Sequence, residues 1–222
     1  MRSDNSWCGP MLVWSHMSSL PELTDGVILL RPPRPEDCDA MHAAVMESVQ
    51  EVSRWLPWCH AGYSREDAAS FIRLAAEAWA RDMRFSFAIL AAEDGAYLGG
   101  IGINHVVAPN RLGNVGYWVR SSRTGRGIAS AAVRLVARYA FGSLGLTRLE
   151  IVCKPDNTSS RRVAEKVGAR FEAISRNRIV MHGVACDAAL YGLVPEDVQA
   201  DNRRDTVIGR SGSSPGGLAE KS

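Results

Sequence analysis

Hydrophobic patterns typical of strands and of helices alternate along most of this chain. Two-residue periodicity and strand-forming residues predict strands over 26–34, 85–92, 96–106, 114–120, 148–153, 170–179 and 184–194. Helical patterns begin near Pro35, Ser64, Ile128 and Asn157. Because the two kinds of element are interleaved, we expect an α/β (mixed α+β) fold in which helices pack on the faces of one mixed sheet.

The patterned region is continuous, and no Pro/Gly-rich linker divides it. We therefore expect a single domain over residues 21–198, which is long enough to bury a proper core. Residues 1–20 lack periodicity and are expected to form a loose extension. Residues 199–222 are rich in Gly, Ser and charge, so we expect a disordered tail there.

Composition excludes several classes of protein. The net charge of +2 and the absence of a helix-turn-helix pattern argue against DNA binding. Five cysteines are scattered without CxxC spacing, so we expect neither a disulfide framework nor a metal site. No stretch approaches the ~20 apolar residues of a membrane span. The chain is expected to be cytoplasmic.

A loop rich in glycine and arginine precedes the helix that begins at Ile128. It reads Thr124, Gly125, Arg126, Gly127. Glycine lets an anion approach the backbone, and the free N–H groups and dipole of a helix start favour negative charge. The loop therefore predicts a phosphate site, although an ordinary strand–helix turn with exposed arginines remains an alternative.

Two motifs in order carry a resemblance to a known family. "YWVRSSRTGRGIASAAV", followed by "DNTSSRRVAEKVGARFE", resembles the GCN5-related N-acetyltransferase (GNAT) superfamily. With "VSRWLPWC", the pair is similar to the RimJ/RimL group, which acetylates the N-terminal amines of ribosomal proteins. The resemblance covers residues 27–198. It implies the GNAT fold, in which a central, largely antiparallel mixed sheet carries helices on both faces.

The resemblance implies that the phosphate belongs to acetyl-CoA, the acyl donor, and that no metal is needed. Thr124 stands where the family usually has Arg or Gln, so the cradle would depend on backbone amides. The cofactor-binding residues implied are Trp118, Val119, Arg120, Gly125, Arg126, Gly127, Ile128, Ala129, Ser130 and Asn157.

The second motif implies catalytic roles. Many members carry a Tyr that protonates the departing thiolate, but Ala164 stands at that position here. In RimJ/RimL-type members a Ser serves instead, which makes Ser160 the candidate donor to the CoA sulfur. Asn157 would bind the pantetheine arm or position the acceptor. Helix capping is the alternative for both residues.

The general base stays unassigned. His105 is the first candidate, because it ends a strand beside the expected opening of the sheet and histidine titrates near neutrality. An exposed strand-end histidine without a catalytic role is the alternative. Glu51 and His60 are weaker candidates.

Three further residues lie near the expected site. Trp55 and Trp58 would line an acceptor groove or belong to the core. Cys153 lacks a recognisable His or Asp partner and is expected to be buried and inert. Acetyl transfer would therefore be direct, without an acyl-enzyme.

These features predict an N-acetyltransferase acting on a primary amine, which would be a ribosomal or other protein N-terminus. Two alternatives stay open: acylation of a small amine such as an antibiotic or polyamine, and a CoA-binding regulatory domain without activity. An exposed final strand could pair with a second copy, so a homodimer is possible.

Overall fold

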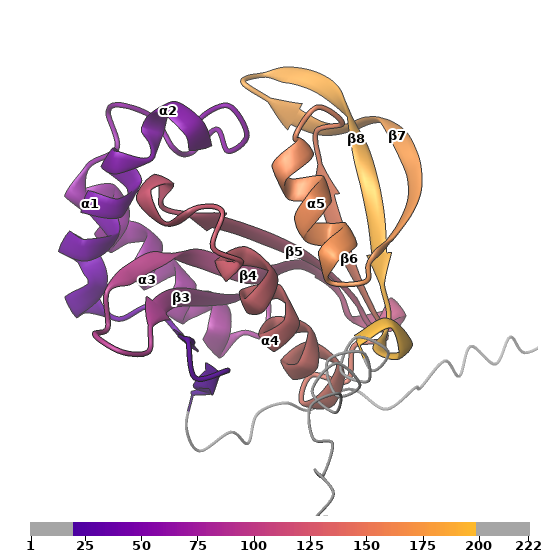
Figure 1. Ribbon diagram of the computed structural model, residues 1–222, viewed down its shortest axis with the longest axis horizontal. Helices are drawn as coiled ribbons and strands as arrows, with labels where there is room; N and C mark the ends of the chain where they lie inside the picture. The colour runs from indigo at the N-terminus through magenta and orange to yellow at the C-terminus, as the bar shows by residue number, and fades with distance from the viewer. Residues whose placement is uncertain (1–19, 199–222) are drawn as a thin grey trace, which may run out of the picture.

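The computed structural model describes residues 20–198 (Figure 1), so the predictions for residues 1–19 and 199–222 lie outside the described part. Its centre is one eight-stranded sheet in the order β1-β2-β3-β4-β5-β6-β8-β7. All neighbouring strands are antiparallel except β5 and β6. The strands are β1 (Leu23–Thr24), β2 (Ile28–Arg31), β3 (Phe85–Ala91), β4 (Tyr97–Val107), β5 (Leu112–Val119), β6 (Arg148–Cys153), β7 (Arg170–Met181) and β8 (Val184–Leu193).

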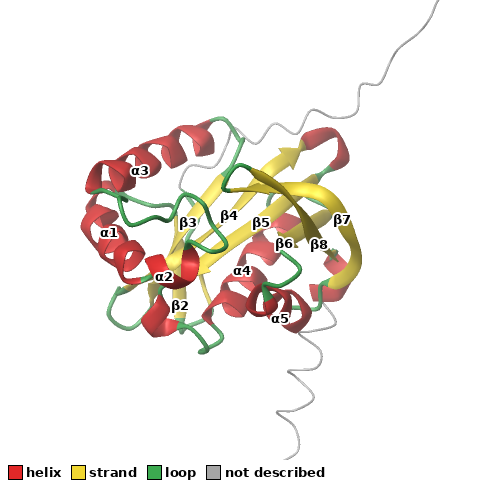
Figure 2. Ribbon diagram, turned by 90° about the horizontal axis from the view of Figure 1, so that it is seen from above, coloured by secondary structure: helices red, strands yellow, loops and turns green. Residues whose placement is uncertain are grey.

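Helices cover both faces of the sheet (Figure 2). One face carries α1 and α3, and the other carries α4 and α5. The helices are α1 (Cys38–Glu47), α2 (Val49–Val52), α3 (Arg65–Ala80), α4 (Ile128–Gly142) and α5 (Thr158–Lys166). This confirms the prediction of a mixed, largely antiparallel sheet between two helical layers.

The apolar stripe predicted for α4 packs into the main core. Ile128, Ala132, Leu135, Val136 and Tyr139 are all at most 9% exposed. They contact the sheet together with side chains of β4, β5 and β6. Because this stripe faces the sheet, the N-terminus of α4 is held at a fixed place beside the carboxyl end of β5.

The helix predicted from Pro35 is interrupted, which the sequence pattern did not indicate. It begins with a 3₁₀ turn, Pro35–Asp37, and α1 ends at Ser48, where φ is −106° and ψ is 3°. The hydroxyl of Ser48 donates to the carbonyl oxygen of Ala44 at 2.7 Å and accepts from the backbone N–H of Ser121 at 3.0 Å. A serine that bonds back to the preceding turn competes with the regular helix, and here it marks the break.

The parallel pair β5–β6 is what opens the sheet. The two strands pair only where Leu112, Gly113 and Asn114 face Arg148, Leu149 and Glu150. After these residues the strands separate, and residues 115–119 of β5 do not pair with residues 151–153 of β6. A V-shaped opening therefore lies between the ends of β5 and β6, beside the starts of α4 and α5.

The far edge of the sheet differs from expectation. The final strand β8 lies inside the sheet, between β6 and β7, so it is not available to a second copy. β7 is the edge strand instead. The prediction of an exposed final strand is therefore wrong, because the chain makes a hairpin that returns inward along β6.

Candidate functional site

The glycine loop forms the start of α4 as a left-handed turn. Gly125 and Gly127 have φ of 75° and 80°, a region that favours glycine. Gly127 is the N-cap residue, and no side chain caps the first turn. A Cβ atom at Gly125 would meet nothing within 4 Å. The backbone N–H groups of this turn are therefore accessible to an anion.

Lys166 is a further cation at this loop that sequence reasoning missed. Its Nζ atom lies 3.8 Å from where a Cβ atom of Gly127 would stand. Lys166 ends α5, and its backbone carbonyl accepts from Nη2 of Arg134 on α4 at 2.8 Å. This contact keeps the ends of the two helices together, so the ammonium group and the N-terminus of α4 can act on the same anion.

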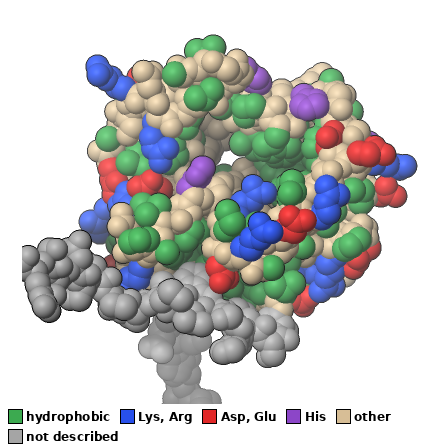
Figure 3. Space-filling model, turned by 180° about the vertical axis from the view of Figure 1, so that it is seen from behind, with side chains coloured by type: hydrophobic (Ala, Val, Ile, Leu, Met, Phe, Trp, Pro, Cys, Tyr) green, Lys and Arg blue, Asp and Glu red, His purple; other side chains and the backbone are tan. Residues whose placement is uncertain are grey.

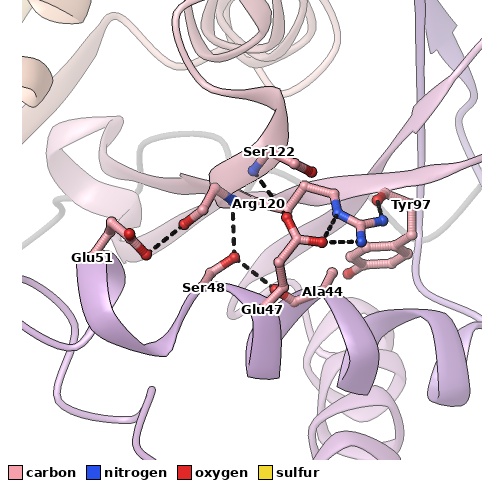
Figure 4. Close-up of polar contacts among 8 residues, drawn as sticks. Ala44, Glu47, Ser48, Glu51, Tyr97, Arg120 and Ser122 are labelled. Carbon is pink, nitrogen blue, oxygen red and sulfur yellow. Dashed lines mark hydrogen bonds and ion pairs between the residues drawn. The ribbon is translucent and has the colours of Figure 1, made fainter.

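Arg120, predicted to contact the cofactor, is engaged by α1 (Figure 4). Its guanidinium group pairs with the Glu47 carboxylate and donates to the Tyr97 carbonyl oxygen at 3.2 Å. Glu47 also accepts from the backbone N–H of Ser122 at 2.9 Å. The hydrogen bond from Arg120 is the main reason that the pKa of Glu47 falls to about 2.

Two more contacts tie the same loop to α2. The buried hydroxyl of Ser48 accepts from the backbone N–H of Ser121, and the Ser121 hydroxyl donates to Glu51 at 2.7 Å. Glu51, a weak candidate for the base, thus holds the loop that precedes the glycines. The segment 120–122 is anchored on α1 and α2 just before it enters the anion-binding turn.

Ser160 and Asn157 lie together at the start of α5. The Asn157 side chain accepts from the backbone N–H of Ser160 at 3.0 Å, which is helix capping. The Ser160 hydroxyl lies 3.0 Å from the hydroxyl of Tyr117 on β5. Burial raises the pKa of the Tyr117 phenol, so that phenol is protonated near neutral pH.

A phenol therefore stands beside Ser160 although Ala164 replaces the tyrosine of the helical motif. Tyr117 supplies it from the strand across the opening, 43 residues away in the chain. Sequence reasoning missed Tyr117. A tyrosine directly before the predicted cofactor-contacting Trp118 was the only signal, and it did not indicate on which face the phenol lies.

Cys153 completes this side of the opening. It is 7% exposed at the end of β6. Burial raises the pKa of its thiol, while a hydrogen bond with Ser160 acts in the opposite direction. The net pKa is raised, so the thiol is protonated near neutral pH, as an inert buried cysteine would be.

Trp118 and Val119 point to opposite faces of β5. Val119 packs against the main core, whereas Trp118 packs on the side of α1 and α3. There the ring of Trp58, 39% exposed, meets Trp118 edge to face at 5.7 Å. Trp58 therefore lies at the surface over the sheet, while Trp55 is half-buried under the guanidinium of Arg54.

His105 stands apart from these residues. It is exposed and occupies a bulge in β4, where φ is 49°. Ile101 of β4 pairs with Tyr117, and His105 lies four residues further on, about 13 Å along the strand. The structure thus brings Ser160, Asn157 and Tyr117 together but does not bring His105 to them. His60 is exposed and lies near Tyr63, with ring centroids 6.5 Å apart.

The β7–β8 turn reaches over the opening. The imidazole Nε2 of His182 lies 3.2 Å from the carbonyl oxygen of Ser53, just after α2. Seen from the side of α1 and α3, the surface is hollowed near its centre, with hydrophobic side chains along part of the hollow (Figure 3).

Residues 20–198 lack two kinds of feature. No three His, Cys, Asp or Glu side chains gather there as a bound metal ion would require. No helix in the same part is long and apolar enough to cross a membrane. The arrangement is a hydrogen-bonding site beside an anion-binding turn.

The chain is similar in sequence and fold to known proteins. YjcK of Bacillus subtilis (strain 168), named as a probable N-acetyltransferase, is 33% identical over 121 residues, which are 54% of this chain and 67% of YjcK. The ribosomal-protein-serine acetyltransferase of Escherichia coli (strain K12) is 29% identical over 97 residues, 44% of this chain and 54% of that protein. The structure of Mycobacterium smegmatis RimJ in complex with CoA-disulfide superposes with a TM-score of 0.73 at 29% identity, covering 86% of this chain and 94% of RimJ.

The model of one family spans most of the site. The acetyltransferase (GNAT) domain matches residues 28–170, which include the opening between β5 and β6, the glycine turn and both residues of the α5 cap. The fold and the activity predicted from the motifs are thereby confirmed at the level of the family. The chain belongs to the GNAT acetyltransferase family, whose members transfer acyl groups from acyl-CoA.

Proposed function

We propose that this acetyltransferase moves an acetyl group from acetyl-CoA to the α-amine of a protein N-terminus. The observation that carries the proposal is the contact between Ser160 and Tyr117 at the mouth of the β5–β6 opening. It lies where β5 and β6 no longer pair, beside the anion-binding turn that starts α4. In this proposal the donor and the acceptor approach this point from opposite faces of the sheet.

In this proposal the glycine turn holds the CoA pyrophosphate. The backbone N–H groups from Arg126 to Ser130 bind phosphate oxygens, and the Lys166 ammonium group adds charge. The pantetheine arm then runs between α4 and α5 into the opening, with Asn157 beside it. Its thioester lies between β5 and β6.

The transfer is direct. The neutral amine nitrogen attacks the thioester carbonyl carbon, so a C–N bond forms, the C–S bond breaks and the thiolate leaves. The Ser160 hydroxyl donates a hydrogen bond to the departing sulfur and accepts one from the Tyr117 phenol. The amine releases its proton to water, since a peptide α-amine has a pKa of about 8 and needs only a weak base. A proton from water then completes the CoA thiol, so each proton released is matched by one taken up.

The names of relatives support a protein acceptor. One relative acetylates a ribosomal protein at serine according to its name, and RimJ is a structural neighbour with 29% identity. The exposed Trp58 beside Trp118 offers an aromatic surface at the acceptor side of the opening. We propose that the acceptor is a ribosomal or other cytoplasmic protein.

Thiol release from acetyl-CoA tests the proposal. Unstructured peptides with different first residues are compared with spermidine and an aminoglycoside, and mass spectrometry locates the acetyl group. We expect turnover with peptides and acetylation at the α-amine. Turnover with spermidine or the aminoglycoside alone would refute the protein acceptor and support the small-amine alternative.

A further inference from the structure

Two glycines face each other on neighbouring strands, on the side of the sheet from which the acceptor would approach. Gly102 of β4 pairs with Gly116 of β5, next to the opening between β5 and β6. This pair shares a face of the sheet with Trp118, two residues further along β5. A Cβ atom at Gly116 would meet one atom within 4 Å, Nδ2 of Asn104 at 3.5 Å. The space above Gly116 is therefore open, and the Asn104 amide borders it.

The side-chain amide of Asn104 uses its oxygen in a hydrogen bond but not its N–H groups. Its oxygen accepts from Nδ2 of Asn114, the facing residue on β5, at 2.9 Å. Its own Nδ2 has no hydrogen-bond partner among residues 20–198. The Asn114 Oδ1 atom is buried and unpartnered within that part of the chain, which is unusual for a buried polar atom. Asn104 is half-buried, so its unused N–H groups are available to a bound ligand.

Asn104, Asn114 and Glu150 form a row across three neighbouring strands, and the carboxylate of Glu150 is paired with two arginines. Glu150 of β6 pairs with Asn114 in the parallel ladder, and its side chain is 15% exposed. Arg148 lies 3.1 Å from one carboxylate oxygen, and Arg178 lies 3.6 Å from the other. The row from Asn104 to Glu150 therefore offers neutral hydrogen-bonding groups rather than net negative charge. It does not suit a polycation.

We infer that the side-chain amide of Asn104 donates a hydrogen bond to the main-chain carbonyl oxygen of the acceptor's first residue. In an N-terminal residue this carbonyl is separated from the α-amine by a single carbon. An amide that borders Gly116 can therefore hold the carbonyl while the amine faces the opening. The inference rests on the proposed function and makes Asn104 the residue that selects α-amino amides over simple amines.

Two uncharged versions of one acceptor backbone test the inference. One is a short peptide that the wild-type enzyme acetylates, and the other is its (E)-alkene isostere, in which CH=CH replaces the first peptide bond and removes the carbonyl without adding a charge. For Asn104→Ala we expect kcat/KM for the peptide to fall about 10-fold through KM, the value of one neutral hydrogen bond. For the alkene isostere kcat/KM should stay unchanged, as should KM for acetyl-CoA.

Two further variants separate binding from folding. Asn104→Leu keeps the size of the side chain and removes its donors without adding a charge, so it should show the same selective loss. Asn110→Ala, an exposed asparagine in the β4–β5 connection, should change neither acceptor. An equal loss on both acceptors, or no loss on the peptide, would overturn the role of Asn104 and leave the proposed function intact. A wild-type enzyme that acetylates no peptide at its α-amine would refute both.

Discussion

Ser160 is the residue on which the proposed chemistry depends most. Ser160→Ala removes the donor to the leaving sulfur, so we expect kcat to fall about 100-fold with little change in acetyl-CoA affinity. Tyr117→Phe removes the phenol that contacts Ser160, and we expect a smaller fall in kcat of about 10-fold. Stopped-flow thiol release and calorimetry measure the two quantities.

The neighbouring serine provides a matched control. Ser159 is exposed on the same helix turn, and Ser159→Ala should leave kcat unchanged. If Ser160→Ala kept the wild-type kcat, the thiolate would be protonated by another group, and Tyr117 would be the first to consider.

Glu47 should make stability depend on pH. Its folded pKa, about 2, lies below its ordinary value of 4.5 because Arg120 and the Ser122 backbone N–H donate to it. The charged form is favoured by folding, so its contribution is present above about pH 4.5 and is lost as the pH falls toward 2. Glu47→Gln should lower the free energy of unfolding by about 1 kcal/mol at pH 7 and by less at pH 3.

Urea unfolding at the two pH values measures this difference. Glu22→Gln disrupts the exposed pair with Arg34 and should cost less at pH 7. A cost of Glu47→Gln that stayed constant between pH 7 and pH 3 would contradict the assigned role of the Glu47 charge.

At the scale of elements, the turn that starts α4 requires a left-handed backbone conformation at Gly125 and Gly127. Gly127→Ala forces a Cβ atom into a left-handed residue at φ of 80° and should destabilise the fold by about 1 kcal/mol. Because this residue also starts the anion-binding turn, acetyl-CoA affinity should fall. Gly95→Ala imposes similar strain at φ of 71° in the β3–β4 hairpin, where a Cβ atom meets nothing.

The comparison of these variants separates strain from binding. Thermal unfolding should show a similar loss for both, and calorimetry should show weaker acetyl-CoA binding for Gly127→Ala alone. Unchanged affinity in Gly127→Ala would mean that the turn does not cradle the phosphates.

Local patterns explain which elements could be predicted from sequence. The apolar stripe of α4 repeats within one helix, and Ser64 caps α3 through Asp67, three residues away. Because both patterns are local, both could be predicted from the sequence. The break at Ser48 could not, because its partner Ser121 lies 73 residues away. The contact of Ser160 with Tyr117 likewise depends on how β5 and β6 diverge, which no local pattern encodes.

At the scale of the whole molecule, β7 is one of the two edge strands of the sheet that residues 20–198 form. Phe171, Ile174 and Val180 on this strand are 50%, 46% and 65% exposed. An unpaired edge with exposed apolar side chains favours pairing with another chain. We therefore expect a homodimer, and light scattering should give twice the chain mass of 24.1 kDa.

A charge on this edge tests the pairing. Ile174→Lys should yield a monomer, whereas Leu74→Lys, at a 53% exposed position on α3, should not. A wild-type protein with the mass of one chain would contradict the dimer.

Calorimetry measures whether the turn before α4 holds coenzyme A. Acetyl-CoA, CoA, ATP and NAD are each titrated into the purified protein. We expect micromolar binding of acetyl-CoA and CoA, and no comparable binding of ATP or NAD. Absence of binding by both CoA species would contradict this expectation, and Gly125 and Gly127 would then belong to an ordinary strand–helix turn.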